Sequence, residues 1–439
     1  MERVVSIILL GLVWPSCGLA KTWEVRKTGG LNSIGAAVRS ASPGDTIKVF
    51  AGVYLEKGLV IDKRLCLIGI GMPVLDGEGR YEIVLVKADG VTFQGFVLRH
   101  SGYSGWNDIA GIHLAGVRGV KVLSNRLDDT FFGLYCQNSD SCVLSGNILV
   151  SRAAMGGQTS GAAVGGQTLG AAVGGQTSGA AMSGQAGNGI HCWHCSHMRI
   201  LDNTISRHRD GIYFEFVTES LIRGNNSAYN VRYGLHFMFS HNDAYEGNTF
   251  RHNEAGVSVM FSHGVDMRGN VFADNLGGGA YGILLKEISD GRIESNRFLH
   301  NTIAIYMEGT TRVQINRNLF SGNGWAIKVQ ASCSEDTISA NNFVGNTFDI
   351  ATNGTLVLNF YDRNYWDKYE GYDIDRDGIG DIPYHPVSLY AMIAEKNPAV
   401  MMLYHSLMVS LLDRTEKVVP SITPVNLVDR RPLMKPLAL

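Results

Sequence analysis

Residues 233–263 read YGLHFMFSHNDAYEGNTFRHNEAGVSVMFSH, and this stretch contains one unit of structure twice. GLHFMFSH at Gly234 returns as GVSVMFSH at Gly256, 22 residues later, and the turn GNTF returns as GNVF at the same spacing. A helical pattern of 3.6 residues per turn imposes no fixed 22-residue register. A parallel β-helix does, because each coil must return to stack on the previous one.

The same unit recurs through most of the chain. Gly-aliphatic-x-apolar copies start at Gly111, Gly133, Gly189, Gly211, Gly234, Gly256 and Gly282, and degenerate copies start at Ala304 and Ala326. A turn that contains asparagine follows each of the nine copies, and a tenth such turn comes later; these asparagines are Asn125, Asn147, Asn203, Asn225, Asn248, Asn270, Asn296, Asn318, Asn341 and Asn364. The pattern predicts an all-β fold, a single-stranded parallel β-helix with coils of about 22 residues.

Strand alternation assigns the two faces of each coil. The apolar residue after each glycine should face inward: Ile112, Leu134, Ile190, Ile212, Leu235, Val257 and Ile283. The next residue should face outward, which gives an imidazole–phenol ladder of His113, Tyr135, His191, Tyr213 and His236. The asparagines should form an internal ladder in which side-chain amides bond neighbouring backbone groups.

Composition excludes some functions. The chain has 439 residues, 45% of them hydrophobic, and a net charge of −2, and it lacks the basic stripe of a nucleic-acid binder. Residues 1–20 have the pattern of a secretory signal peptide cut after Ala20, although Cys17 leaves a lipoprotein alternative. Export permits disulfides. The remaining six cysteines are too few for a disulfide framework: Cys66, Cys136, Cys142, Cys192, Cys195 and Cys333.

The β-helix is predicted over residues 21–365. An amphipathic helix over residues 31–42, capped by Asn32 or Ser33, should cover its first coil. Residues 153–188 contain four tandem nine-residue units such as AAVGGQTSG, which predict a disordered insertion at a turn, with extra coils as the alternative.

The C-terminal part has a different composition. Residues 366–388 form an acidic, Asp-rich turn, and residues 389–439 should form a Met-rich helix and an extended tail that binds a partner. Pro398 favours a helix that begins at Asn397. The apolar run is too short and too interrupted to span a bilayer.

Met238, His241, Met260 and His263 are the first candidate metal ligands. Stacked coils place equivalent side chains about 4.8 Å apart. Thioether and imidazole donors together suit Cu(I). The alternative is that the methionines pack as an apolar column and the histidines occupy surface turns.

HCWHCSH at residues 191–197 is a second candidate. Cys192 and Cys195 have the spacing of a metal or redox pair. Cys192 shares the inward position of Phe214, so it should belong to the core, which leaves His191, His194 and Cys195 as outward soft-metal ligands.

Asp373, Asp375, Asp377 and Asp381 are a calcium candidate, because the run DIDRDG begins like an EF-type loop. The twelfth position is Tyr384 and not glutamate, which excludes a complete EF-hand. The alternative is an Asp-capped turn.

The polar groups beside the ladder are the candidates for acid–base chemistry. Arg207, His208, Arg209 and Asp210, with Tyr213 and Glu215, form a cluster, but no strand face carries the paired carboxylates that glycosidases use.

The runs HRDGIYFEF, YGLHFMFSH and NYWDKYEGYDIDRDGIGDIPY resemble the NosD family, periplasmic accessory proteins of nitrous oxide reductase maturation. The resemblance covers nearly all of the chain after residue 20. It implies a right-handed parallel β-helix and work with an ABC transporter (ATPase and membrane subunit), a copper chaperone lipoprotein and nitrous oxide reductase. The implied task is assistance in copper delivery for the copper–sulfide centre of that reductase. The nine-residue units and HCWHCSH do not match the family pattern.

Two function classes therefore remain. The first is a non-enzymatic, periplasmic copper-handling protein associated with the inner membrane through the transporter. The second is a polysaccharide lyase, epimerase or hydrolase, a common use of this fold. Soft ligands at coil spacing, without a carboxylate pair, favour the first.

Overall fold

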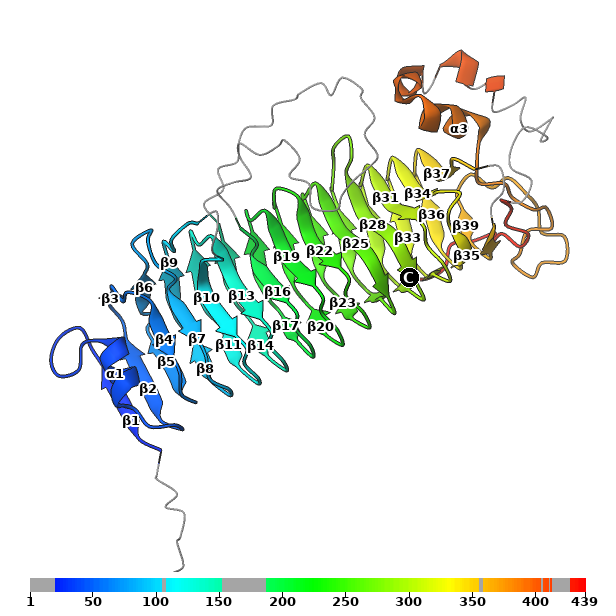
Figure 1. Cartoon of the computed structure of the whole chain (residues 1–439). Helices are drawn as coiled ribbons and strands as arrows, with labels where there is room; N and C mark the ends of the chain where they lie inside the picture. Colours follow the sequence, from blue (N-terminus) through cyan, green and yellow to red (C-terminus); the bar gives the residue numbers. More distant parts are fainter. Residues whose placement is uncertain are drawn as a thin grey trace, which may run out of the picture.

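The computed structural model describes residues 20–104, 108–151, 187–354, 358–403, 406–409, 411–412 and 427–439. Three parallel sheets of 12, 14 and 13 strands run along an elongated rod, which confirms the predicted parallel β-helix (Figure 1). The predicted signal peptide lies outside the described residues except for Ala20. The predicted insertion lies outside them except for Gly187 and Asn188.

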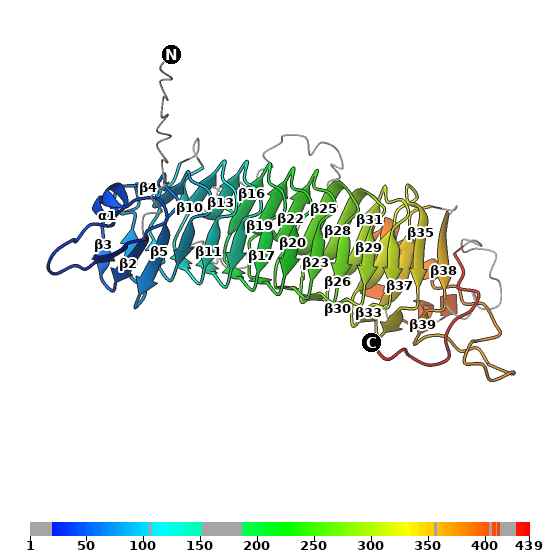
Figure 2. The same cartoon turned by 90° about the horizontal axis from the view of Figure 1, so that it is seen from below.

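Each complete coil contributes one strand to each sheet, and equivalent strands of successive coils stack side by side along the rod (Figure 2). The 12-stranded sheet contains β4 (Leu59–Ile61), β7 (Val84–Val86), β10 (Ala110–Ala115), β13 (Phe132–Gln137), β16 (Ile190–Trp193), β19 (Asp210–Glu215), β22 (Tyr233–Met238), β25 (Ala255–His263), β28 (Tyr281–Ser289), β31 (Ile303–Glu308), β34 (Trp325–Val329) and β37 (Phe348–Thr352).

The 14-stranded sheet contains β1 (Thr22–Val25), β2 (Thr46–Phe50), β5 (Cys66–Ile70), β8 (Thr92–Gln94), β11 (Lys121–Leu123), β14 (Val143–Ser145), β17 (Arg199–Leu201), β20 (Leu221–Arg223), β23 (Ala244–Glu246), β26 (Asp266–Arg268), β29 (Arg292–Glu294), β32 (Gln314–Asn316), β35 (Ser334–Ser339) and β38 (Leu358–Asp362).

The 13-stranded sheet contains β3 (Val53–Tyr54), β6 (Val74–Asp76), β9 (Val97–Arg99), β12 (Arg126–Asp128), β15 (Ile148–Val150), β18 (Thr204–Ser206), β21 (Asn226–Ala228), β24 (Thr249–Arg251), β27 (Val271–Ala273), β30 (Arg297–Leu299), β33 (Leu319–Ser321), β36 (Asn342–Val344) and β39 (Tyr365–Trp366).

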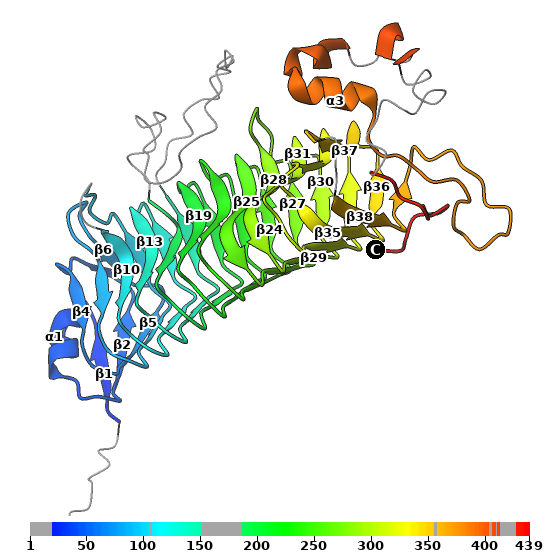
Figure 3. The same cartoon turned by 45° about the vertical axis from the view of Figure 1, so that its right-hand side comes forward.

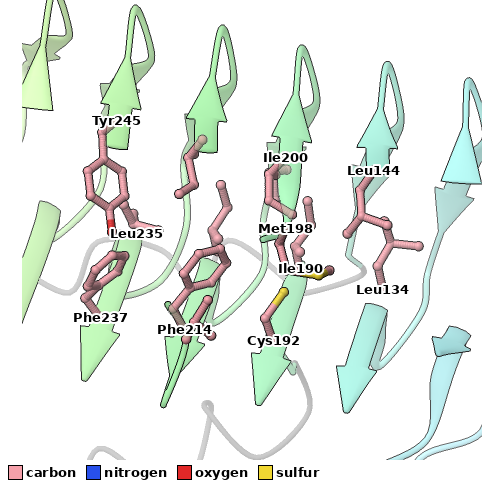
Figure 4. Packing of buried hydrophobic residues seen from close by; sticks show 14 of the residues in the cluster. Leu134, Leu144, Ile190, Cys192, Met198, Ile200, Phe214, Leu235, Phe237 and Tyr245 are labelled. Carbon is pink, nitrogen blue, oxygen red and sulfur yellow. The ribbon is translucent and has the colours of Figure 1, made fainter. Parts of the chain in front are cut away.

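The core is made of columns of like side chains. The predicted inward residues, from Ile112 to Ile283, are all buried, and the register pairs each with its equivalent one coil away. Figure 4 shows Leu134, Ile190 and Leu235 among this packed interior. Burial of these columns is the main stabilising term of the fold.

The predicted asparagine ladder is present. From Asn125 to Asn364, side-chain Nδ2 groups donate to the Oδ1 of the next asparagine at 2.9–3.1 Å. A second ladder, which the sequence analysis missed, contains Asn230, Asn253, Asn275, Asn301, Asn323 and Asn346. Its signal was present as the repeated spacing N-x-F-x-x-N, as in NTFRHN and NVFADN.

Helix α1 (Ile34–Ser40) covers the first coil. Ser33 caps it by accepting a hydrogen bond from the backbone N–H of Ala36, so the helix is shorter than the predicted 31–42 and Asn32 is not the cap. Ile34, Ala37 and Val38 are buried in the core at this end.

The C-terminal prediction needs two corrections. Helix α3 (Leu389–Lys396) begins after its cap Ser388 and ends before Pro398, which starts the separate 3₁₀ helix η1 (Pro398–Leu403). The helix predicted to begin at Asn397 is therefore this short 3₁₀ helix, with Pro398 in its first turn, and the α-helix precedes it. Residues 427–439 are not free for a partner, because Asp429 and Leu433 form bridges with Tyr361 and Tyr365 of the last coil.

Among the described residues, no helix is long and apolar enough to cross a membrane. Helix α3 instead lies against the end of the 12-stranded sheet, beside β37 (Figure 3).

Candidate metal sites

The two methionines and the two histidines of the first candidate each stack as predicted. Met238 and Met260 are register partners on β22 and β25. The His241 and His263 rings have centroids 4.0 Å apart, and their Nδ1 atoms are separated by 2.8 Å.

A corner of the coil separates these pairs. Phe239 and Phe261 occupy it with φ of 48° and 54°, and the following Ser240 and Ser262 are buried inside. Met238 belongs to the 12-stranded sheet, whereas His241 bridges to Thr218 beyond the corner. The geometry therefore favours two separate pairs of soft donors over one four-ligand cluster.

The thioether pair has polar neighbours. The Tyr213 hydroxyl lies 3.9 Å from Met238 Sδ and donates to the Glu215 carboxylate at 3.3 Å. Glu215 is itself the register partner of Met238. Met238 and Met260 are both half-buried, so solutes can reach them. Two thioethers beside a carboxylate form a donor set that accepts Cu(I).

The environment of His241 favours its neutral form. Burial lowers the pKa of His241, and the adjacent His263 lowers it further. Neutral imidazole is the form that binds metal. The two rings therefore offer a second two-donor site on the exposed edge of the rod.

The second candidate does not assemble as predicted. His191 packs between Tyr135 and Tyr213, with ring centroids 4.9 and 4.7 Å away, and His194 occupies the corner with its ring stacked on Phe216. Cys195 is buried, and its thiol donates to the Cys136 carbonyl at 3.4 Å. The outward prediction for Cys195 is wrong, because the corner at His194 turns the chain and directs the next side chain inward.

The outward ladder is continuous but is not an open surface. Its successive rings lie 4.8, 4.9, 4.7 and 5.0 Å apart from His113 to His236. Tyr135 is only 4% exposed and His236 only 7% exposed. Burial lowers the pKa of His236 to about 4, and neither of its ring nitrogens has a hydrogen-bond partner in the described residues.

The polar cluster beside the ladder is an enclosed ion pair. Asp210 is fully buried, and Arg232 binds both of its oxygens, at 3.1 and 3.0 Å. Arg232 was not predicted from the sequence, although it occupies the position equivalent to Arg209 in the next coil. Because both oxygens are engaged, Asp210 is poorly placed to act as a general acid or base.

The acidic loop brings three of its four predicted ligands together. Asp373, Asp375 and Asp377 have carboxylate oxygens within 4.8 Å of one another. Asp381 instead accepts a hydrogen bond from the backbone N–H of Ile374 at 2.7 Å. Backbone N–H groups of Gly378 and Ile379 bond Asp373 and Asp377, so the loop also has the geometry of an Asp-capped turn.

Comparison with known proteins bears on these sites. Residues 173–373 match the family model described as "Periplasmic copper-binding protein (NosD)". This is a NosD-family protein. The matched range contains the methionine pair, the histidine pair and the start of the acidic loop, and the NosD family description places such proteins in the periplasm.

Two curated relatives of this NosD-family chain carry the name "Probable ABC transporter binding protein NosD". One, from Stutzerimonas stutzeri, is 30% identical over 135 residues, and the other, from Pseudomonas aeruginosa, is 27% identical over 141 residues. The matches cover 30% and 31% of this chain and 31% of each relative. The match thus spans about a third of the relatives' length.

Solved structures similar to this NosD-family chain share its fold. The A-module of the mannuronan C-5 epimerase AlgE6 from Azotobacter vinelandii superposes with a TM-score of 0.55, at 12% identity, over 77% of this chain and 97% of its own. A GH87 α-1,3-glucanase from Streptomyces thermodiastaticus gives a TM-score of 0.57, at 12% identity, over 79% of this chain and 69% of its own. These identities support the β-helix alone.

Proposed function

We propose that this protein is a non-enzymatic periplasmic copper-handling factor that assists copper delivery during maturation of nitrous oxide reductase. The observation that carries the proposal is the register pair Met238–Met260, which lies inside the stretch that matches a copper-binding family. The bound copper is cargo, held as Cu(I) and passed on. A copper chaperone lipoprotein would supply it and the reductase would receive it.

The alternative of a carbohydrate-modifying enzyme has less support. The neighbouring solved structures include such enzymes, but they are only 12% identical to this chain. Asp210, the buried acid beside the ladder, is held by Arg232 on both oxygens. No catalytic residue is therefore proposed.

The test is anaerobic Cu(I) titration of the full chain against a coloured chelator. We expect wild-type protein to compete for Cu(I), and Met238→Leu/Met260→Leu to lose that competition. Met402→Leu is the matched control, because Met402 is 90% exposed and far from the pair in sequence. Wild-type protein that removes no copper from the chelator would refute copper carriage by this chain.

The membrane subunit of an ABC transporter, with its ATPase, is the proposed docking partner. Helix α3 is fixed to the rod by a half-buried ion pair of 2.5 Å between Lys328 and Glu395. Beyond it, Met402, Leu407 and Met408 expose 90%, 89% and 64% of their area, an apolar surface suited to a protein partner. Met402→Ser/Leu407→Ser should reduce co-purification with that subunit, and Leu276→Ser, also an exposed leucine, should not.

A further inference from the structure

Four cysteines lie on two neighbouring coils. Cys136 and Cys142 are on the coil that precedes residues 152–186, which lie outside the described residues, and Cys192 and Cys195 are on the coil that follows them. Strands β13 and β16 pair directly, although 56 residues separate Cys136 from Cys192. Other neighbours in the 12-stranded sheet are only 22 to 28 residues apart.

Cys136 and Cys192 are placed to react with each other. They are register partners on adjacent strands, and both are fully buried. The separation of neighbouring strands, about 4.8 Å, lies within the Cα range of about 4.4–6.8 Å that a disulfide needs. Figure 4 shows Cys192 among Ile190 and Met198 in the core.

The surroundings favour a neutral cross-link over a bound ion. The side chains around Cys192 are apolar, and an ion or thiolate there would lose its hydration without compensation. A disulfide carries no charge. The disulfide would also join the pair of neighbouring strands that the longest stretch of sequence separates. Bringing together the ends of a longer stretch costs more conformational entropy.

We propose that Cys136 and Cys192 form a disulfide that joins these two neighbouring coils. The oxidant is a small-molecule or protein disulfide of the periplasm. The thiolate of one cysteine attacks it and forms a mixed disulfide, and the second cysteine then displaces the remaining oxidant sulfur. One S–S bond forms and one breaks, and the oxidant leaves as two thiols. This inference does not depend on copper carriage.

Cys195 provides the competing arrangement. Cys195 is also buried and lies three residues after Cys192, so a bond between Cys192 and Cys195 would close a loop within one coil. That bond would leave the two coils unlinked. Only the Cys136–Cys192 pair links one coil to the next, which makes the identity of the bonded pair the decisive measurement.

The experiment maps disulfides in the exported full chain. Protein purified without reductant, or reduced and reoxidised with glutathione disulfide, is unfolded in denaturant so that buried thiols can react, alkylated with iodoacetamide and cut with trypsin and chymotrypsin. Cleavage after Trp193 separates Cys192 from Cys195, and fragment spectra separate Cys136 from Cys142. We expect a peptide pair joined through Cys136 and Cys192, with Cys66, Cys142, Cys195 and Cys333 alkylated.

Stability provides the second readout. Reductant should lower the melting temperature of the wild type but not of Cys136→Ser/Cys192→Ser. Cys66→Ser/Cys333→Ser is the control and should keep the response, because these two cysteines lie on other coils. Alkylation of both Cys136 and Cys192 in the oxidised wild type, or a bond between Cys192 and Cys195, would overturn the proposal. The mapping uses wild-type protein, so it stands even if a variant fails to fold.

Discussion

Asn364 donates two hydrogen bonds to Asp429, one from its backbone N–H at 3.0 Å and one from its side-chain Nδ2 at 3.1 Å, both to Oδ2. Asp429 thus occupies the position that the next asparagine of the ladder would have. The same oxygen accepts a hydrogen bond from Trp366 Nε1 at 3.1 Å. A residue 65 positions along the chain therefore closes the ladder at the end of the rod.

Asp429→Ala should destabilise the protein substantially. Asp429 is fully buried, and its removal leaves three buried donors without an acceptor. Each such donor costs about 1–3 kcal/mol, so we expect the free energy of unfolding to fall by about 3 kcal/mol or more. Chemical denaturation measures it. Arg431→Ala, which removes only an exposed ion pair with Asp362, should change little, and equal losses in both variants would contradict this account.

Asn270→Ala should lower the free energy of unfolding as much as the truncation of a buried apolar side chain does. Asn270 Nδ2 bonds Tyr245 O and Asn296 Oδ1, and its Oδ1 accepts from both nitrogens of Asn248. Loss of these buried bonds should lower the free energy of unfolding by about 2–4 kcal/mol. Gln314→Ala, on an exposed position of β32, is the control. A denaturation midpoint that does not move for Asn270→Ala would mean that the ladder is not stabilising.

Acidification should destabilise the fold through His236. Burial lowers its pKa to about 4 in the folded state, against about 6.5 in the unfolded chain. Between these values the unfolded state binds more protons, so stability is present above about pH 6.5 and is lost as the pH falls toward 4. This difference in the pKa of His236 corresponds to a loss of at most about 3 kcal/mol in the free energy of unfolding.

Urea denaturation at pH 7 and at pH 4.5 tests this linkage. His236→Phe should lose less stability on acidification than the wild type, because it removes the group that gains a proton. His300→Phe is the control, since His300 is exposed. The same loss in His236→Phe and the wild type would show that other buried groups carry the pH dependence.

Calcium is proposed as the ligand of the acidic loop. Three carboxylates at Asp373, Asp375 and Asp377 suit a hard cation. The loop touches the C-terminal segment, because the Met434 N–H bonds Gly378 O at 3.0 Å. Bound calcium should therefore raise the melting temperature, and EDTA should lower it. Asp375→Ala should abolish both effects, whereas Asp266→Ala, at an exposed pair on β26, should retain them. If the melting temperature is the same with and without EDTA, the loop binds no calcium and is only an Asp-capped turn.

The sequence predicted most of the fold but only part of the candidate sites. Met238 and Met260 pair as predicted because they lie within strands, where side chains alternate with a period of two. His241 and Cys195 follow corners with left-handed residues, Phe239 and His194, where that alternation is interrupted. The separation of His241 from Met238 and the burial of Cys195 were therefore not evident from strand alternation.

The 22-residue repeat by itself determined the parallel β-helix, its inward columns and its first asparagine ladder. These follow from the repeat because like residues in successive coils must stack. Only the tertiary structure decided how the rod ends and where its corners point. Asp429 reaches Asn364 from a segment with no repeat, and no local pattern specifies which distant residue will satisfy the last donors of a ladder.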